Sequence, residues 1–246
     1  MNGSDEYFEA VLALLSRLRV SQREASARAA DIVATALRAD GVVHLFGTGH
    51  SHLLAEEVFY RAGGLIPIQA MLDPSVLLSS GARASTATER TPGAAAEIAG
   101  RYQLRRGDVG IVISNSGRNP APVEMAQLMK ARGLTVIALT NLRQSAASPP
   151  RAPLRQRLFE VADVVLDNGG AAGDACLQLP SVPYPVGPTS TIAGAVLLHA
   201  VLIGAMERLV AAGATVVNLP SGNIDGVDLS AVLAAFERYR DRIRHW

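Results

Sequence analysis

The chain has 246 residues, of which 49% are hydrophobic, 18% charged and 4% aromatic, and its formal net charge is +1. With few aromatic residues and no block of basic residues, a nucleic-acid partner is not expected. The single cysteine, Cys176, excludes a disulfide framework and a cysteine-built zinc site. No apolar run reaches the roughly 18–20 residues that a membrane span needs. Since the acidic N-terminus also lacks the basic start of a signal peptide, we expect a cytoplasmic protein with no membrane partner.

Two helices are expected over residues 5–39, because apolar residues recur on one helical face and Ser21 to Glu24 has the spacing of a capping box. Beyond them, short apolar runs alternate with helical patterns. This alternation predicts an α/β fold, a doubly wound parallel sheet with helices on both faces. The predicted strands are Val42–Phe46, Leu65–Ile68, Val109–Ile113, Leu134–Leu139 and Val161–Leu166. The predicted helices are Leu53–Ala62, Thr91–Arg105, 120–132, Thr189–Ala212 and Leu229–Ile243.

We expect residues 1–246 to form one domain, with a core over about residues 30–215 and helical extensions at 5–39 and 229–243. The Ser- and Pro-rich segment 141–156 is interpreted as a surface insertion, with a lid as the alternative.

Three hydroxyl-rich loops precede helices, and two of them directly follow predicted strands. They are Gly47-Thr-Gly-His-Ser51, Ser114-Asn-Ser-Gly-Arg118 and Gly187-Pro-Thr-Ser-Thr191. Glycines let the backbone approach an anion, and helix N-termini offer free N–H groups, so these loops together indicate a bound phosphate. The only lysine, Lys130, lies at a helix end, so the donors would be neutral. His52, followed by Leu53, stands where a third glycine would complete a dinucleotide fingerprint, which counts against NAD.

These three motifs, in this order and spacing, resemble the sugar isomerase (SIS) domain of phosphosugar isomerases and binding proteins. The whole chain also resembles stand-alone bacterial SIS proteins of the UPF0309 type. The resemblance implies a five-stranded parallel sheet, a homodimer or tetramer with its site near the subunit interface, and a small-molecule sugar phosphate as ligand. It also implies a phosphate cradle of Ser51, Ser114, Ser116 and Thr191, with Asn119 in a place often held by threonine. The candidate substrate-binding residues are thus Gly47, Gly49, His50, Ser51, His52, Ser114, Asn115, Ser116, Gly117, Asn119, Thr189, Ser190 and Thr191.

Glutamates on the helix after the first loop are candidate catalytic bases. Phosphoheptose isomerases and N-acetylmuramic acid 6-phosphate etherases also carry a glutamate on this helix, although farther along it. We favour Glu57 over Glu56, and the alternative is that both are solvated or paired with Arg61. Glu89 matches the place of the etherases' second glutamate, the acid partner. Its alternative role is that of a helix-start carboxylate.

The histidines differ in expected role. His44 lies inside a predicted strand and is interpreted as a core residue, whereas His50 and His52 flank Ser51 and could help to bind a charged ligand. His199 lies on the helix where phosphoheptose isomerases place a catalytic histidine. The two histidines of His50-x-His52 are too few ligands to indicate a zinc site, so we expect no metal and no cofactor. Asp174, after the last strand, is a candidate contact for sugar hydroxyls.

Three functions are compatible with these residues. A lyase that eliminates the C3 substituent of an N-acetylamino-sugar 6-phosphate, such as N-acetylglucosamine 6-phosphate, is favoured on the pairing of Glu57 with Glu89. An aldose–ketose isomerase would use Glu57 with His199. A non-catalytic phosphosugar sensor is the third alternative.

Overall fold

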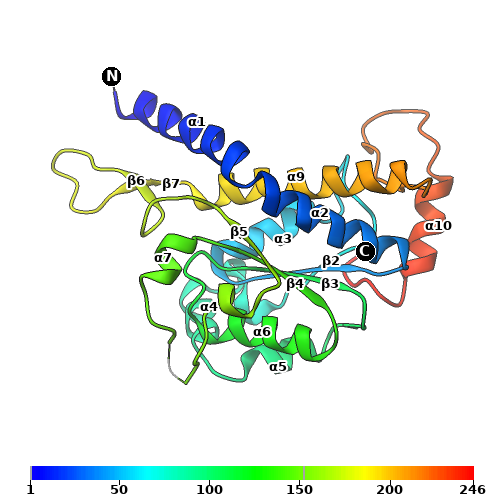
Figure 1. Cartoon of the computed structure of the whole chain (residues 1–246), viewed down its shortest axis with the longest axis horizontal. Coiled ribbons are helices and arrows are strands. Elements are labelled where there is room, and N and C mark those ends of the chain that lie inside the picture. Colours follow the sequence, from blue (N-terminus) through cyan, green and yellow to red (C-terminus); the bar gives the residue numbers. More distant parts are fainter. Residues whose placement is uncertain (1, 152) are drawn as a thin grey trace.

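The computed structural model describes residues 2–151 and 153–246, and a five-stranded parallel sheet forms its centre (Figure 1). The strand order is β2-β1-β3-β4-β5, so the order reverses direction between β1 and β3. In such a sheet, ligands bind where the carboxyl ends of the strands meet this switch point. The predicted doubly wound α/β fold with five parallel strands is therefore confirmed. The strands are β1 Val43–Gly47, β2 Ile68–Ala70, β3 Val109–Ile113, β4 Thr135–Thr140 and β5 Val164–Asp167.

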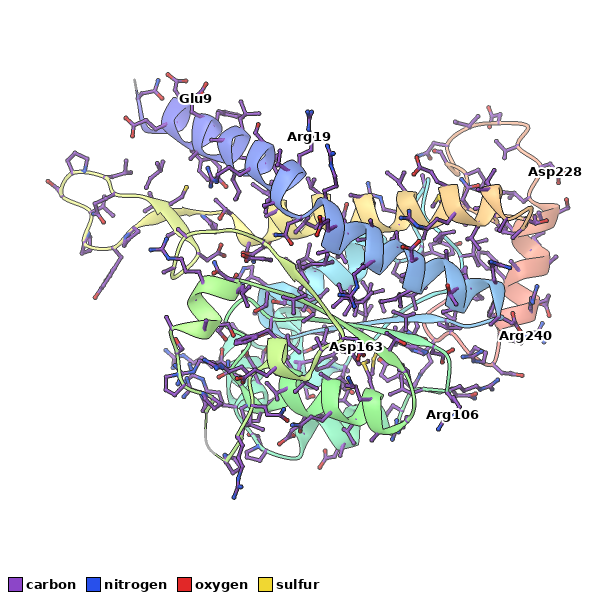
Figure 2. All side chains as sticks on the ribbon, viewed as in Figure 1. Glu9, Arg19, Arg106, Asp163, Asp228 and Arg240 are labelled. Carbon is purple, nitrogen blue, oxygen red and sulfur yellow. The ribbon has the colours of Figure 1, made fainter. Side chains whose placement is uncertain are left out.

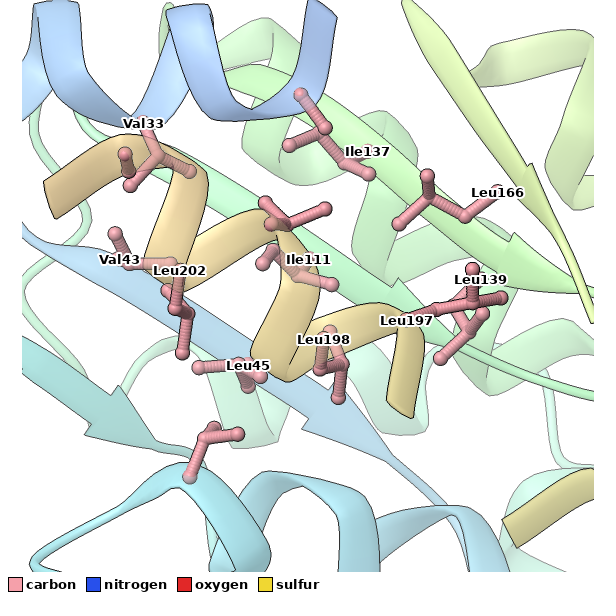
Figure 3. Close-up of a cluster of buried hydrophobic side chains, with 14 of the residues drawn as sticks. Val33, Val43, Leu45, Ile111, Ile137, Leu139, Leu166, Leu197, Leu198 and Leu202 are labelled. Carbon is pink, nitrogen blue, oxygen red and sulfur yellow. The ribbon is translucent and has the colours of Figure 1, made fainter. Parts of the chain in front are cut away.

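Helices α2, α3 and α9 cover one face of the sheet, where alternate strand residues form a continuous apolar layer. Ile111 of β3, Ile137 of β4 and Leu166 of β5 point to this face, and Leu198 and Leu202 of α9 pack on them (Figure 3). Because strand residues alternate between faces, each strand supplies this layer with every second side chain. These helices span α2 Arg23–Arg38, α3 His52–Val58 and α9 Ser190–Ala211.

The opposite face carries a second apolar layer under α5, α6 and α8, around Phe46, Val112 and Ala138. The bounds of these helices are α5 Ala94–Ala99, α6 Pro120–Ala131 and α8 Leu158–Val161, with α7 Leu142–Ala146 between β4 and α8. Since helices shield both faces, the strands could be recognised as short runs of apolar residues. Charged side chains such as Arg106, Asp163 and Arg240 are exposed outside these layers (Figure 2).

Helix α1 (Gly3–Ser21) extends away from the sheet together with a hairpin of β6 (Ala175–Leu177) and β7 (Val186–Pro188), which the sequence did not predict (Figure 1). The two are joined by a hydrogen bond of 2.6 Å from the Tyr7 hydroxyl to the carbonyl of Pro188. The expected capping box at Ser21 is wrong. Gln22 separates α1 from α2, and its side-chain oxygen accepts a hydrogen bond from the backbone N–H of Asp167 at the end of β5.

The segment between β2 and β3 also differs from expectation. An unpredicted helix, α4, spans Ala82–Glu89, and the next helix begins only at Ala94. The Thr91 hydroxyl donates to the carbonyl of Ala87, so Thr91 closes α4 instead of opening α5. Gly93, in the left-handed region at φ 87°, precedes α5. Short 3-10 turns lie at Gly49–Ser51, Pro74–Val76 and Leu78–Ser80.

The C-terminal segment follows α10 (Ser230–Tyr239) and is anchored to the amino-terminal edge of the sheet. Asp108, which is buried before β3, accepts hydrogen bonds from Arg242 at 2.7 Å and from Nε2 of His44 at 3.0 Å. It also accepts from the backbone N–H groups of Val42 and Arg105. Burial alone would raise the pKa of Asp108, but these hydrogen bonds outweigh it and hold the pKa at about 2.

His44 is fully buried in β1, as expected for a core residue. Burial lowers its pKa despite the raising effect of Asp108, so the imidazole is neutral and donates Nε2–H to the carboxylate. Both groups thus have pKa values lowered by folding. The stability linked to each group is complete above its unfolded-state pKa. It is lost as the pH falls from that value through the lower folded-state pKa, first for His44 and then for Asp108.

We predict that Asp108→Asn lowers the free energy of unfolding by about 3–5 kcal/mol at pH 7, because the buried guanidinium of Arg242 loses its counter-charge. Urea denaturation measures this loss. Asp241→Asn, an exposed change on the same segment, is the control and should cost less than about 0.5 kcal/mol. Wild type should also lose stability between about pH 4 and pH 2 to a greater extent than the Asp108→Asn variant. Equal losses for the two variants at pH 7 would contradict the anchoring role.

Candidate functional site

The carboxyl ends of β1, β3, β4 and β5 meet the N-terminus of α9 at one edge of the sheet, as the parallel topology requires. Here a pocket of about 10 Å³, roughly the space of one water molecule, is enclosed between the loops. The pocket is polar on its loop side and apolar toward the sheet. It is lined by Ser51, Leu54, Ile113, Asn115, Leu139, Asn168, Ser190 and Thr191.

The loop after β1 is closed tightly on itself. A Cβ atom at Gly47 would lie 2.5 Å from the carbonyl oxygen of Ser51, so only glycine allows this turn. His52 is buried and its Nδ1 is hydrogen-bonded to the carbonyl of Gly49, so His52 fixes the loop, whereas His50 is exposed. Of the residues expected in this loop, Ser51 is the one that lines the pocket.

The loop after β3 is held in place largely by its own polar groups. The buried Ser114 hydroxyl accepts a hydrogen bond of 3.2 Å from the N–H of Gly117, while Ser116 is half-buried. Asn115 accepts a bond of 2.8 Å from the side chain of Asn168, which follows β5. Gly117 has φ 60°, and a Cβ atom there would lie 2.7 Å from the Ser145 hydroxyl, so the loop packs directly on α7.

Asn119 occupies a different setting from the one expected of a phosphate ligand. Its amide donates to Glu89 at 2.6 Å, and its oxygen accepts from Nε of Arg151 at 2.8 Å. Glu89 is the last residue of α4, so its alternative role as a helix-start carboxylate is wrong. The sequence did not single out Arg151, since it lies in the segment interpreted as a surface insertion.

At the N-terminus of α9, the carboxylate of Asp174 already accepts hydrogen bonds from the free donor groups. Asp174 accepts from the N–H of Thr189 at 3.1 Å, from the N–H of Ser190 at 2.7 Å and from the Ser190 hydroxyl at 2.6 Å. Thr191, one residue further, faces the small pocket. Asp174 therefore lies at the predicted edge, but its carboxylate is turned onto the helix.

Glu57 and His199 are brought together between α3 and α9. The Glu57 carboxylate lies 3.2 Å from Nε2 of His199 and is also paired with Arg61. Both side chains are about one-third exposed (35% and 36%), so solvent or a ligand can reach them. Glu56 points elsewhere and is exposed, with His52 3.8 Å away.

Glu57 and His199 lie further along their helices than the residues that line the small pocket. Glu57 follows Ser51 by six residues, and His199 follows Thr191 by eight. At 1.5 Å per helical residue these separations are about 9 Å and about 12 Å along α3 and α9. Both helices begin near the carboxyl ends of the strands, so Glu57 and His199 lie at similar distances from the pocket along α3 and α9.

Several site residues were missed by sequence reasoning, and most of them are amides. Asn141 donates to the carbonyl of Gly170 at 2.9 Å, and Gln144 accepts from the N–H of Gly173 at 3.2 Å. Asn141 and Asn168 directly follow β4 and β5, so their place at the carboxyl edge was a usable signal. Within residues 2–151 and 153–246, no three His, Cys, Asp or Glu side chains lie close enough to hold a metal ion.

Comparisons with known proteins give the family. The sequence model of the SIS domain matches residues 6–141. UPF0309 proteins from Brucella ovis and Brucella canis are each 44% identical over 242 residues, which cover 98% of this chain and 98% of theirs.

Solved structures with the same fold are more distant in sequence. A phosphoheptose isomerase from Francisella tularensis has a TM-score of 0.59 at 18% identity, covering 84% of this chain and 100% of its own. The phosphoheptose isomerase of Neisseria gonorrhoeae has a TM-score of 0.53 at 21% identity, covering 83% and 97%. The NanR protein of Vibrio vulnificus, complexed with ManNAc-6P, has a TM-score of 0.50 at 15% identity, covering 99% and 71%. By its sequence, the chain belongs to the SIS domain family and, within it, to the UPF0309 proteins.

Proposed function

We propose that this protein binds a sugar phosphate at the carboxyl edge of its sheet and interconverts the aldose and ketose forms of the sugar. The observation that carries the proposal is the contact of Glu57 with His199 between α3 and α9. A carboxylate and an imidazole side by side can move one proton between carbons and another between oxygens. The phosphoheptose isomerases that share the fold support this reaction class.

The phosphate is placed at the small pocket. Ser51 and Thr191 supply hydroxyl groups there, and the 22-residue helix α9 directs its positive end to the same point. No lysine is needed, because neutral donors and a helix terminus suffice for an anion. A sugar phosphate with its phosphate here would extend from the strand ends toward Glu57 and His199. NanR, which shares the fold, is complexed with a sugar phosphate, ManNAc-6P.

The chemical step begins on the open-chain sugar. Glu57 removes the proton from C2, and the electron pair forms a C1–C2 double bond while the carbonyl oxygen O1 takes a proton from His199. The resulting enediol is shared by aldose and ketose. His199 then removes the proton from O2, and Glu57 returns its proton to C1. Both side chains end in their starting protonation states.

The lyase expected from the sequence receives less support. Elimination needs an acid at the C3 substituent, and Glu89 was the candidate for that acid. The carboxylate of Glu89 is engaged by Asn119 on the other side of the sheet edge, whereas the group in contact with Glu57 is His199. We therefore place isomerisation ahead of elimination.

We predict that Glu57→Gln lowers turnover at least about 100-fold, because it removes the general base but keeps the shape of the side chain. Proton NMR in deuterated water is the measurement, with heptose phosphates and hexulose phosphates as isomerase substrates and N-acetylglucosamine 6-phosphate as the probe of elimination. Deuterium at C1 or C2 with aldose–ketose interconversion is the expected result. Glu56→Gln is the matched control and should keep wild-type turnover.

Other outcomes would contradict the isomerase. A vinyl signal would establish elimination instead. Ligand line broadening without any exchange would establish a sensor. Equal losses in the two glutamine variants would exclude Glu57 as the specific base.

We also propose that a second copy of the chain covers the outer side of α9. Ile192, Val196 and Ile203 are exposed on the same side of α9 as His199. A groove of about 690 Å³ continues from Val196 to Leu12 of α1. Contrary to the expectation from the sequence, α9 is long and apolar enough to cross a membrane. Because 44% of its apolar window is buried in the core, its remaining apolar face fits a protein partner.

We predict that wild type sediments as a dimer and that Leu12→Arg with Val196→Arg dissociates it, because two charges would be buried in an apolar contact. Sedimentation velocity at micromolar concentration is the measurement. Leu233→Arg, an exposed leucine on α10, is the control and should leave the dimer intact. A monomeric wild type, or a dimeric double variant, would contradict the assignment of this surface.

A further inference from the structure

We propose that Asp174 is an internal competitor of the substrate phosphate, and that the loop 168–174 moves away from α9 when a phosphate binds. This inference rests on the proposed function, since it needs a phosphate at the carboxyl edge. The starting observation is that the Asp174 carboxylate takes both backbone N–H groups at the start of α9 and the hydroxyl of Ser190. These are the kinds of donors that bind phosphate at helix N-termini.

A second observation is that one buried polar group at this helix start has no hydrogen-bond partner even with Asp174 in place. Thr189 is only 2% exposed, and its hydroxyl oxygen finds no hydrogen-bond partner within residues 2–151 and 153–246. This hydroxyl lies beside Gly170, where an added Cβ atom would approach it to 3.1 Å. A buried hydroxyl without a partner is costly. A tetrahedral anion at the start of α9, with more acceptor oxygens than a carboxylate, can accept from Thr189 as well.

The available space requires a movement. The pocket beside Ser190 and Thr191 holds about 10 Å³, which suits one water molecule but not a phosphate group. Asp174 lies directly on the donors at its rim. A phosphate that reaches these donors must therefore displace the carboxylate.

The loop that carries Asp174 contains two glycines that allow its backbone to change conformation. Gly169 and Gly173 both lie in the left-handed region ahead of Asp174, at φ 60° and 79°. Asp174 itself has φ 68°, which is uncommon for a residue with a side chain. The loop is held closed by Asn141, which donates to the carbonyl of Gly170, and by Gln144, which accepts from the N–H of Gly173. The N–H of Thr189 also donates to the backbone carbonyl of Asp174 at 3.2 Å, and this bond must open as well.

Competition of this kind lowers the apparent affinity of the site for phosphate. The open form is only a fraction of the free protein, and the apparent dissociation constant rises by the inverse of that fraction. Removing the negative charge of Asp174 weakens its hold on α9 and also removes its repulsion of an incoming anion.

The test is the binding of inorganic phosphate to the full-length protein, measured by calorimetry. We expect Asp174→Asn to bind phosphate roughly fivefold more tightly than wild type, because a neutral amide bonds the helix more weakly than a carboxylate does. Asp225→Asn, the same charge change in an exposed loop, is the matched control and should bind as wild type does. Asp174→Ser provides a second uncharged variant should the asparagine variant fold poorly.

A measurement on wild type gives an independent readout. Saturating phosphate should speed hydrogen exchange of the backbone amides in segment 168–176 and slow it at the first turn of α9. A folded asparagine or serine variant that binds phosphate no more tightly than wild type would overturn the competition and make Asp174 a permanent helix cap. If wild type itself binds no phosphate, the phosphate site of the proposed function fails together with this inference.

Discussion

The packing of α9 across the sheet is the contact on which the candidate site depends. Leucines of α9 at 197, 198 and 202 are buried against β1, β3 and β4, and α2 and α3 pack along its sides. This packing fixes both the position and the rotation of a helix that carries functional groups at two levels. Its first turn meets the strand ends, and its third turn brings His199 to Glu57. Burial of apolar surface thus sets the distance between the small pocket at the strand ends and the pair of Glu57 and His199.

Polar groups have different roles at the amino-terminal and the carboxyl-terminal ends of the strands. At the amino-terminal edge, Asp108 and Arg242 form a buried ion pair in which both charges are balanced, and the result is a fixed C-terminal segment. At the carboxyl edge, the buried groups are mainly amides and hydroxyls, such as Asn141, Asn168 and Thr189. Neutral groups can exchange one hydrogen-bond partner for another without leaving a charge unpaired. The rigid anchor and the candidate ligand site therefore lie at opposite ends of the same strands.

The strands and the long helices could be predicted because local pattern determines them. Val109–Ile113 was predicted to the residue, since a strand buried on both faces reads as a continuous apolar run. The start of α5 could not be predicted from Thr91 and Pro92, because Thr91 bonds backward to α4. The two candidate phosphate loops that follow predicted strands were recognisable from their glycines and hydroxyls. The contact of Glu57 with His199 joins residues 142 positions apart, and the sequence offered this pairing only as an alternative to that of Glu57 with Glu89. The partners of Asn119 and Asp174 were hidden for the same reason.

The edge strands of the sheet have a consequence for solubility. An open strand edge presents unpaired backbone groups that can join the sheet of another molecule and start aggregation. Here β2 has only three residues, and the side chain of its Gln69 accepts a hydrogen bond of 2.6 Å from the backbone N–H of Arg244. At β5, the outer strand on the opposite side, the side chain of Gln22 accepts a hydrogen bond of 3.0 Å from the backbone N–H of Asp167. Residues from segments near the two ends of the chain thus each supply a hydrogen-bond partner at one outer strand, which leaves fewer free backbone groups there for a strand of another molecule to join.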